Sequence, residues 1–488
     1  MPEKLKIPLV YLITSLFLAL SIYMVIKGFY WAVLIPAGIL IVLLYVYSFD
    51  LIFWLIVLAT PLAINIRDFD MGFGVSLPTE PLLLGILVLF VVKLLFSDRL
   101  DRRFLKHPIT IAIFINLIWI LITSVTSEIP LVSFKFFLAR LWFVVPMYFV
   151  GFILFKRFKN IKIFSWLYVL TLLIVIGYTI YNHSKFAFNE DEGHWVMSPF
   201  YNDHTAYGAI LAFFIPVMIG FGFDKSSRQN VRIAAFAIFL VLMIALILSY
   251  SRAAWLSLAF AFFVYIIILL RIKFRWILLS FIFIFGIFFS FKFEILDRLE
   301  KNKQDSSANL VEHIESITNI SSDASNLERV NRWQAALRLF YERPVFGWGP
   351  GTYQFEYAPY QRSKEKTIIS TNAGDRGNAH SEYIGPLAES GILGMLTFLS
   401  IIVLIIWSGI RSYRRAERRD VKLLSMVTVL SFVTYAVHSL MNNFLDSDKA
   451  SVPFWGFAAI IVAIDIYHCP QAKKKEENTD KESVNTEQ

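Results

Sequence analysis

The chain of 488 residues is too apolar for a soluble protein, with 57% hydrophobic residues, 17% charged residues and a mean hydropathy of +0.61. This composition is typical of a protein whose solvent is largely lipid. The formal net charge of +9 comes from short Lys and Arg clusters between apolar runs, which favours membrane topology over a nucleic-acid partner as its cause. The single cysteine, Cys469, excludes an internal disulfide and a cysteine-based zinc site.

Long apolar runs predict transmembrane helices, because a helix needs roughly 20 apolar residues to cross a bilayer. The first run is too long for a signal peptide and lacks a small-residue cleavage site, so we expect it to be retained. The fold class predicted is all-α, a polytopic transmembrane helical bundle of about 14 spans rather than a β-barrel. In chain order the runs cover 7–26, 29–47, 50–66, 80–96, 109–127, 136–155, 163–182, 206–223, 233–250, 253–270, 276–292, 383–408, 423–441 and 451–468.

The basic clusters predict the orientation, because Lys and Arg are retained on the cytoplasmic side of a membrane. With the N-terminus inside, this number of spans places every cluster on that side, so both termini are predicted to be cytoplasmic. The domains expected are helices 1–11 over 1–292, an extracytoplasmic loop domain over 293–380, helices 12–14 over 381–468 and a disordered tail over 469–488. The clusters are 4–6, 99–106, 156–162, 225–232, 271–275, 411–422 and 473–475.

The long outer loop is predicted to contain an amphipathic helix over 326–341, with Asn326 as N-cap and Pro344 after its end. The following PVFGWGPGTY is too rich in glycine and proline to remain helical, so we expect it to fold the loop back over the bundle. The apolar residues at helical spacing are Val330, Trp333, Leu337 and Phe340.

Two arginines lie within or beside apolar runs, Arg140 in FFLARLWF and Arg252 in SYSRAAW. The predicted topology puts both near the outer boundary of the hydrocarbon layer, where a charged group is costly unless it is paired or functional. A guanidinium at this depth can hold a phosphate at headgroup level through two hydrogen bonds. A lipid pyrophosphate is the expected ligand, and the alternative is that each side chain snorkels to the surface.

His380 lies where the long loop re-enters the membrane, on the same predicted face as the arginines. An imidazole can take a proton from an attacking hydroxyl near neutral pH, although a lone interfacial histidine is often structural. Glu382 and Glu389 are candidates to orient His380, and Glu389 is equally suited to a local cap or pair. We include Glu382 among the expected substrate-binding residues.

Two further outer segments carry candidate substrate-binding residues. His194 and His204 lie before a predicted helix for which Asp203 or Asn202 would be the N-cap. Arg329 and Arg332 are close to one helical turn apart, a spacing suited to an anionic saccharide or lipid headgroup or to a solvated helix face.

The first outer loop contains Asp68 and Asp70 in a DxD arrangement, whose carboxylates are oxygen ligands for a divalent cation. Two carboxylates are weak grounds for a metal site, and no glycine-rich nucleotide loop is present. We therefore expect no metal site and no cofactor.

Three stretches together resemble the O-antigen ligase and polymerase superfamily of polytopic bacterial envelope proteins. The resemblance covers roughly residues 195–460 and includes the order of the stretches and the long outer loop between them. They are SRAAW at 251–255, RVNRWQAALRLFYERPVFGWGPGTY at 329–353 and NAHSEYIGPLAESGILG at 378–394.

The resemblance implies a metal-independent, inverting GT-C glycosyltransferase that uses a polyprenyl (undecaprenyl) pyrophosphate-linked glycan. By the same resemblance, Arg252 would hold the pyrophosphate leaving group and His380 would activate the acceptor or bind beside it. Family ligases also carry an essential arginine in the loop before the eighth span, where this chain has none. His194 is the nearest basic substitute, and Arg140 is the other candidate for that phosphate contact.

The expected reaction joins the glycan to a lipid A core on the outer face of the bacterial inner membrane. The alternatives are a polymerase that uses another repeat unit as acceptor and a protein O-oligosaccharyltransferase, because both would need the same kind of site. A flippase or transporter is the alternative from a different class, and it should carry charged residues along the membrane interior rather than at one face. Beyond donor, acceptor and membrane lipids we expect no partner, and no nucleic acid.

Overall fold

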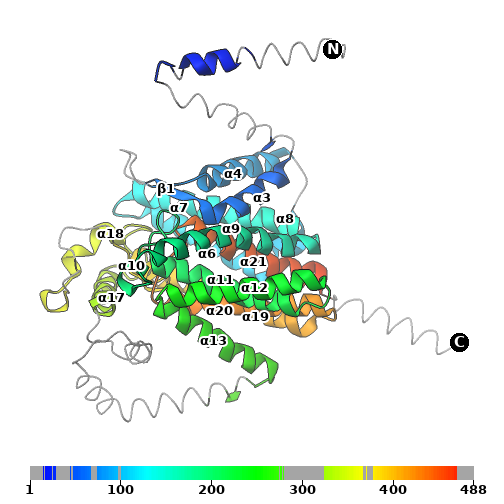
Figure 1. Ribbon diagram of the computed structural model, residues 1–488. Helices are drawn as coiled ribbons and strands as arrows, with labels where there is room; N and C mark the ends of the chain where they lie inside the picture. The colour runs from blue at the N-terminus through cyan, green and yellow to red at the C-terminus, as the bar shows by residue number, and fades with distance from the viewer. Residues whose placement is uncertain are drawn as a thin grey trace. The chain divides into compact units, whose positions relative to one another are not determined.

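The computed structural model describes residues 48–66, 74–96, 100–273, 324–366 and 377–469, together with short pieces at 15, 17–24, 26–28, 44–45, 275–276, 279 and 370. The chain divides into two compact units, Met1–Ile56 and Val57–Gln488. The helices that surround the candidate site belong to the second unit, whose arrangement can be followed in Figure 1.

Ten helices within the described ranges are long and apolar enough to cross a membrane, so the protein is a polytopic membrane protein. Each coincides with one of the runs expected from the sequence. They are α4 (Thr79–Phe96), α6 (Pro108–Val125), the continuous α7–η3–α8 (Pro130–Val144, Val145–Val150, Gly151–Phe155), α9 (Phe158–Ser184), α11 (His204–Phe223), α12 (Gln229–Leu248), α13 (Arg252–Leu269), α19 (Ile384–Arg415), α20 (Arg419–His438) and α21 with η6 (Asp448–Ala463, Ile464–His468).

The expected span 50–66 is shorter than predicted. Helix α3 (Phe49–Ala59) continues only through the 3₁₀ turn η2 (Thr60–Leu62), because Pro61 lacks an N–H donor and the chain then turns extended at Ala63. Strand β1 (Ile64–Ile66) follows and pairs antiparallel with β2 (Val75–Leu77), the one departure from an all-helical fold in the described residues. The expected spans 7–26, 29–47 and 276–292 lie largely outside those residues.

Burial differs among the spans in the way expected of a bundle in lipid. Helices α11 and α21 are almost completely buried, whereas α12 and α13 expose most of their surface. Helix α11 packs against α12 and α20, and α19 packs against α20 and α6. The exposed helices therefore surround the buried ones. The site forms at one end of the buried helices.

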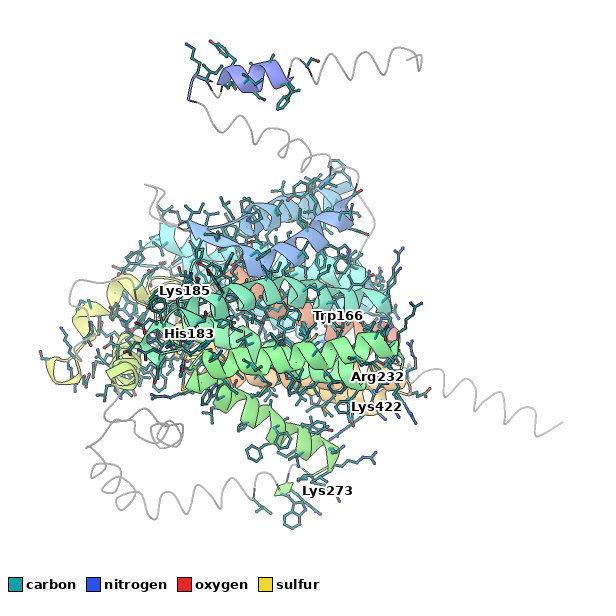
Figure 2. All side chains as sticks on the ribbon, viewed as in Figure 1. Trp166, His183, Lys185, Arg232, Lys273 and Lys422 are labelled. Atoms are coloured by element: carbon teal, nitrogen blue, oxygen red, sulfur yellow. The ribbon has the colours of Figure 1, made fainter. Side chains whose placement is uncertain are left out.

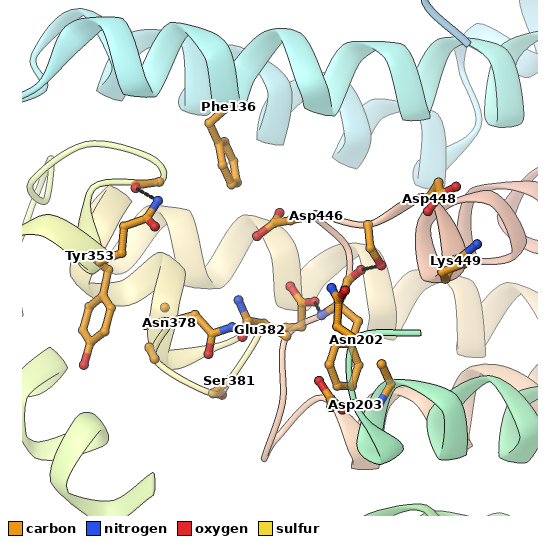
Figure 3. Close-up of a pocket in the computed structure, with 18 of the residues that line it drawn as sticks. Phe136, Asn202, Asp203, Tyr353, Asn378, Ser381, Glu382, Asp446, Asp448 and Lys449 are labelled. Carbon is orange, nitrogen blue, oxygen red and sulfur yellow. Dashed lines mark hydrogen bonds between the residues drawn. The ribbon is translucent and has the colours of Figure 1, made fainter. Parts of the chain in front are cut away.

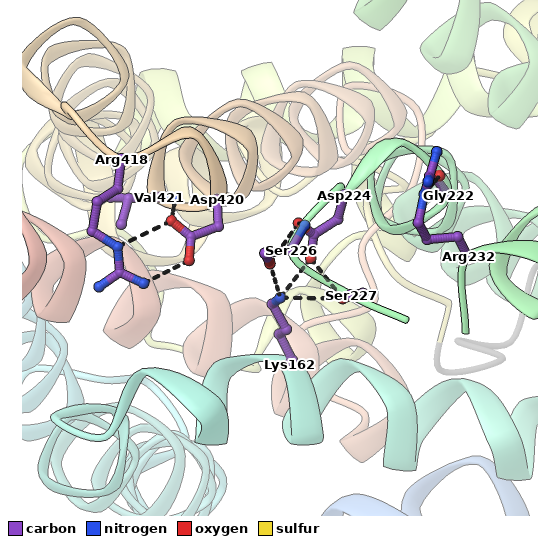
Figure 4. Close-up of polar contacts among 9 residues, drawn as sticks. All are labelled: Lys162, Gly222, Asp224, Ser226, Ser227, Arg232, Arg418, Asp420 and Val421. Atoms are coloured by element: carbon purple, nitrogen blue, oxygen red, sulfur yellow. Dashed lines mark hydrogen bonds and ion pairs between the residues drawn. The ribbon is translucent and has the colours of Figure 1, made fainter. Parts of the chain in front are cut away.

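The two ends of the bundle differ in charge. The connections 96–108, 155–158, 223–229 and 415–419 lie at one end, where Lys162 donates to Asp224 and Arg418 pairs with Asp420 at 2.6 Å (Figure 4). Figure 2 shows Arg232 and Lys422 toward this end, and His183 and Lys185 at the other. The sequence clusters predicted to share one membrane face therefore do meet at one end of the bundle, as far as they are described.

Helix α17 (Ala324–Glu342) confirms the helix predicted in the outer loop but corrects two details. It begins at Ala324, so Asn326 lies in its first turn and is not its N-cap. Its buried face is not the predicted apolar stripe, because Val330 is 37% exposed. The buried residues are Glu328, Asn331, Arg332, Ala335, Ala336 and Leu339, and each polar member of this set makes at least one hydrogen bond within the set or to a neighbouring segment.

The glycine-rich run after α17 packs on the bundle, as the sequence predicted. The backbone N–H of Trp348 donates to Ala388 O and that of Gly349 to Glu389 O, at 3.2 and 2.8 Å. Helix α19 kinks at Gly391, whose φ of +69° is in the region that favours glycine. The remaining short elements are α5 (Arg102–Leu105), α10 (Glu190–Gly193), α18 (Tyr353–Glu356), η4 (Ala358–Tyr360) and η5 (Ser363–Glu365).

Candidate functional site

A cavity of about 450 Å³ opens at the end of the bundle opposite the basic connections. Four parts of the second unit that are distant in sequence contribute most of its wall: α7, the segment before α11, the segment around the start of α19, and the loop between α20 and α21 (Figure 3). Arg140 lies about three helical turns after Pro130, roughly 15 Å along α7 at 1.5 Å per residue. The cavity therefore extends well inside the bundle.

Arg140 lies in the cavity wall and pairs with the carboxylate of Asp446. Its Nη2 lies 3.4 Å from Asp446 Oδ1, its guanidinium lies over the Phe136 ring, and its Nη1 is buried with no hydrogen-bond partner among the described residues. The side chain is 10% exposed, whereas that of Asp446 is 54% exposed because it projects into the cavity. A buried guanidinium nitrogen without a protein partner is the kind of group that a bound polar ligand satisfies.

Glu382, a candidate to orient His380 or to bind substrate, holds the loop that carries Asp446. Its Oε1 accepts hydrogen bonds from Tyr435 OH and from the backbone N–H groups of Phe444 and Leu445, at 3.0, 2.7 and 2.8 Å. Burial and the Asp446 charge raise the pKa of Glu382 to about 7, against the opposing effect of Arg140. Glu382 lines the cavity, and its carboxyl group binds a proton more readily than an exposed glutamate does.

The far wall of the cavity carries Asp448 and Lys449 at the start of α21. The Lys449 ammonium donates to the backbone carbonyls of Thr60 and Ala63, at 2.7 Å for Ala63, so its charge is directed away from the cavity. The Asp448 carboxylate accepts from the Thr79 hydroxyl. Both residues thus fasten the start of α21 to its neighbours.

A group of basic side chains lies beside the cavity rather than in its wall. His194 stacks on His204, with ring centroids 4.2 Å apart. Asp203 is the N-cap of α11, as predicted, accepting from the N–H groups of Thr205 and Ala206 at 2.8 Å each. His204 lies within electrostatic range of Arg329 on α17.

His380 joins this group from the segment before α19. It has a φ of +49°, held by a hydrogen bond from its N–H to Asn378 Oδ1 at 3.0 Å. Burial lowers the pKa of His380 to about 4, and the charges of Arg332 and Arg329 act in the same direction. The imidazole is therefore neutral at physiological pH and has a nitrogen lone pair that can take a proton, while the same burial and charges make it a weaker base than an exposed imidazole. Its neighbours Ala379 and Ser381 line the cavity.

Arg332, expected to bind substrate, is buried and paired within the protein. Its Nε donates to Glu328 Oε1 at 2.8 Å and its Nη1 to Asn378 O at 3.1 Å. A Cβ on Gly377 would approach this guanidinium to 1.6 Å. Arg332 thus anchors the segment that presents His380.

Arg252 opens α13 directly after the sharp corner at Tyr250, whose φ is +49°. The preceding Ser251 packs so closely on α11 that a Cβ at Gly208 would lie 2.7 Å from it. Gly208 is one turn after His204. Arg252 is therefore placed beside the start of α11, and it is not among the residues that line the cavity.

Two residues of this region were missed by the sequence analysis. Asp446 lines the cavity, and His438 at the end of α20 is buried with neither ring nitrogen hydrogen-bonded to any described residue. His438 lies within electrostatic range of Asp203, His204 and Arg329. The polar run Asn442–Lys449 between the last two apolar stretches was the available signal for Asp446. His438 ends an apolar run, where the sequence has no feature that separates it from a core histidine.

A metal site has no support in the described part of the chain, where no group of three or more His, Cys, Asp or Glu is arranged to hold an ion. Asp68 and Asp70 lie outside the described residues.

Comparison with known protein families matches residues 236–399 to the family described as O-antigen ligase. The three stretches that carried the resemblance all lie inside this region. A search of curated proteins finds no match. The chain is therefore a multi-pass membrane protein that carries an O-antigen ligase family domain over residues 236–399.

Proposed function

We propose that this protein transfers a glycan from a polyprenyl pyrophosphate carrier to an acceptor hydroxyl on the extracytoplasmic face of the membrane. The observation that carries the proposal is the cavity beside a histidine and arginine cluster, at the end of the bundle opposite the basic connections. The family match supports a glycan ligase or polymerase reaction. The charge asymmetry supports the orientation, because basic connections are retained in the cytoplasm.

In the proposed reaction the acceptor oxygen forms a bond to the anomeric carbon as the bond from that carbon to the pyrophosphate oxygen breaks. The acceptor proton passes to the neutral His380, and the electron pair of the broken bond stays on the pyrophosphate. Arg252 and Arg329 offset the charge that grows on this leaving group. Arg329 lies beside His204 and so provides the cation that the loop before α11 lacks.

The charged side chains within the spans bear on the alternative of a transporter. Arg140, Glu80, Glu389, Asp448 and Lys449 all gather at the cavity end, and Asp465 lies near the other end, where it pairs with Arg415. A path for a charged substrate across the bilayer would need polar groups between these ends. The distribution among the described residues therefore favours chemistry at one face.

The test is transfer in vitro by purified protein from a polyprenyl pyrophosphate-linked oligosaccharide, with EDTA present. The acceptors are a lipid A core, the repeat unit itself and a hydroxyl-bearing peptide, since each would give a distinct product. We expect product with one acceptor, and a loss of at least 100-fold for Arg252→Ala and for His380→Ala.

Matched controls are Arg228→Ala and His468→Ala, which change the same residue types at the opposite end of the bundle and should retain activity. Equal activity in all four variants would remove the site assignment. Absence of product with every acceptor would overturn the proposed function.

A further inference from the structure

The cavity wall combines three kinds of side chain that suit a sugar. Aromatic rings offer apolar faces to sugar C–H groups, while amides and carboxyl groups hydrogen-bond to hydroxyls. The wall includes the rings of Phe136 and Phe200, the amides of Asn202 and Asn443, and the carboxyl groups of Glu382 and Asp446.

Acidic side chains outnumber basic ones in the described part of this wall. Five carboxyl groups line it, of which Glu382 is only partly ionised because its pKa is raised, beside two cationic side chains, Arg140 and Lys449. Lys449 is engaged by two backbone carbonyls, and Arg140 is 10% exposed and directed at Asp446. Asp446 is the more accessible member of this ion pair, because 54% of its side chain is exposed.

The cation that would attract an anion lies elsewhere. Arg329 belongs to the neighbouring cluster with His194, His204 and His380, of which His204 and His380 are neutral at physiological pH, and none of these residues lines the cavity. The phosphate end and the sugar end of a bound substrate therefore meet surfaces of opposite charge. An acidic group on the sugar would lie among carboxylates in a site of reduced dielectric, which weakens its binding about tenfold or more.

We propose that this cavity holds a glycan unit that carries no negative charge, and that its carboxyl groups reject acidic sugars. The inference rests on the proposed function, because it assumes that the bound molecule is a glycan. Selectivity by repulsion is a general way to distinguish ligands that are equal in size and hydroxyl pattern. The accepted unit is a neutral or amine-bearing sugar.

The experiment is saturation-transfer difference NMR with the full chain in nanodiscs, which detects millimolar binding without requiring transfer. The probes are methyl glucoside, methyl glucosaminide and methyl glucuronide, which differ at one position each and carry zero, positive and negative charge. We expect signals from the glucoside and the glucosaminide, and a dissociation constant at least tenfold higher for the glucuronide.

Asp446→Asn should reduce the ratio of the glucuronide to the glucoside dissociation constant by about threefold or more. Asp420→Asn, at the opposite end of the bundle, should leave this ratio unchanged. Asp448→Asn is a second cavity variant if the first does not fold. Glucuronide binding equal to that of the glucoside, or no binding of any probe, would overturn the inference. Transfer activity in the separate assay would show that the proposed function stands in either case.

Discussion

The chemistry of the site depends at the residue scale on one arginine shared by two carboxyl groups. Arg140 pairs with Asp446 and lowers the pKa of Glu382, whereas burial and the Asp446 charge raise the pKa of Glu382. Glu382 meanwhile accepts three hydrogen bonds through one oxygen. Glu382 thus holds the loop 439–447 in place and is also a group in the cavity whose charge changes with pH.

Replacement of Glu382 by Gln should flatten the pH dependence of stability. Folding raises the pKa of Glu382 from 4.5 to about 7, so its protonated form is favoured in the folded state. Its contribution to stability is therefore fully present below pH 4.5 and is lost as the pH rises through 7. Glu382→Gln keeps the accepting oxygen but cannot titrate. Thermal unfolding in nanodiscs between pH 5 and 8.5 should show a shallower decline for this variant.

The control for this measurement is Glu417→Gln, which removes an exposed carboxylate at the opposite end of the bundle. It should reproduce the native curve. A Glu382→Gln variant with the native slope would show that another group is responsible.

The pairing of Arg140 is tested by a double-mutant cycle. Arg140→Met should lower the free energy of unfolding by about 2 kcal/mol, less than for a fully buried ion pair because Asp446 faces the cavity. Arg140→Met combined with Asp446→Asn should recover part of this loss, because the unpaired carboxylate is then absent. Thermal unfolding of Arg140→Met, Asp446→Asn and the double variant measures the coupling, and strictly additive losses would contradict the pairing.

At the element scale, the site is held by the contact between the glycine-rich run and the kink in α19. A Cβ at Gly391 would lie 2.1 Å from Val345 O, and one at Gly347 would lie 2.3 Å from the Glu389 carbonyl carbon. Glu389 Oε1 in turn accepts from the N–H of Tyr353 at 3.1 Å. The kink therefore fixes the segment from Trp348 to Tyr353 against the start of α19, where Glu382 and Glu389 enter the cavity.

Gly391→Ala should destabilise the protein by about 2–3 kcal/mol, because it adds both an unfavourable positive φ and a backbone clash. The matched control is Gly177→Ala in α9, where a Cβ meets no described atom within 4 Å. That change should be neutral or stabilising, since alanine has the higher helix propensity. Thermal unfolding compares the two, and equal effects would show that the kink does not need glycine.

Helix α17 shows why element positions were easier to predict than the faces they bury. Periodicity located the helix, but it favoured Val330 and Trp333 as the buried stripe. The buried face instead carries Glu328, Asn331 and Arg332, and the Glu328 carboxylate accepts hydrogen bonds from both Asn331 and Arg332. A sequence pattern that counts only apolar residues cannot find a buried network of this kind, because its stability depends on partners distant in the chain.

At the scale of the whole molecule, apolar runs predicted every long span in the described residues, since lipid leaves a helix few alternatives. The cavity could not be predicted, because it combines α7, α19 and the α20–α21 loop, and no local pattern indicates which helices become neighbours. Arg140 and Glu382 were identified as single residues. That Asp446 lies between them depends on the packing of three distant segments.

The predicted orientation of the bundle can be tested by cysteine accessibility. Cys469 is buried and is the single cysteine, so Cys469→Ala gives a background without thiols. Lys185→Cys introduces an exposed thiol at the cavity end, and Lys225→Cys introduces one among the basic connections. A membrane-impermeant maleimide applied to intact cells should label the first and not the second, because basic connections remain in the cytoplasm.

After cell disruption both thiols should react, which controls for their accessibility in the folded protein. Labelling of Lys225→Cys alone in intact cells would place the cavity in the cytoplasm. A carrier-linked glycan presented on the opposite face would then have no access to the cavity, and the proposed function would fail with the orientation.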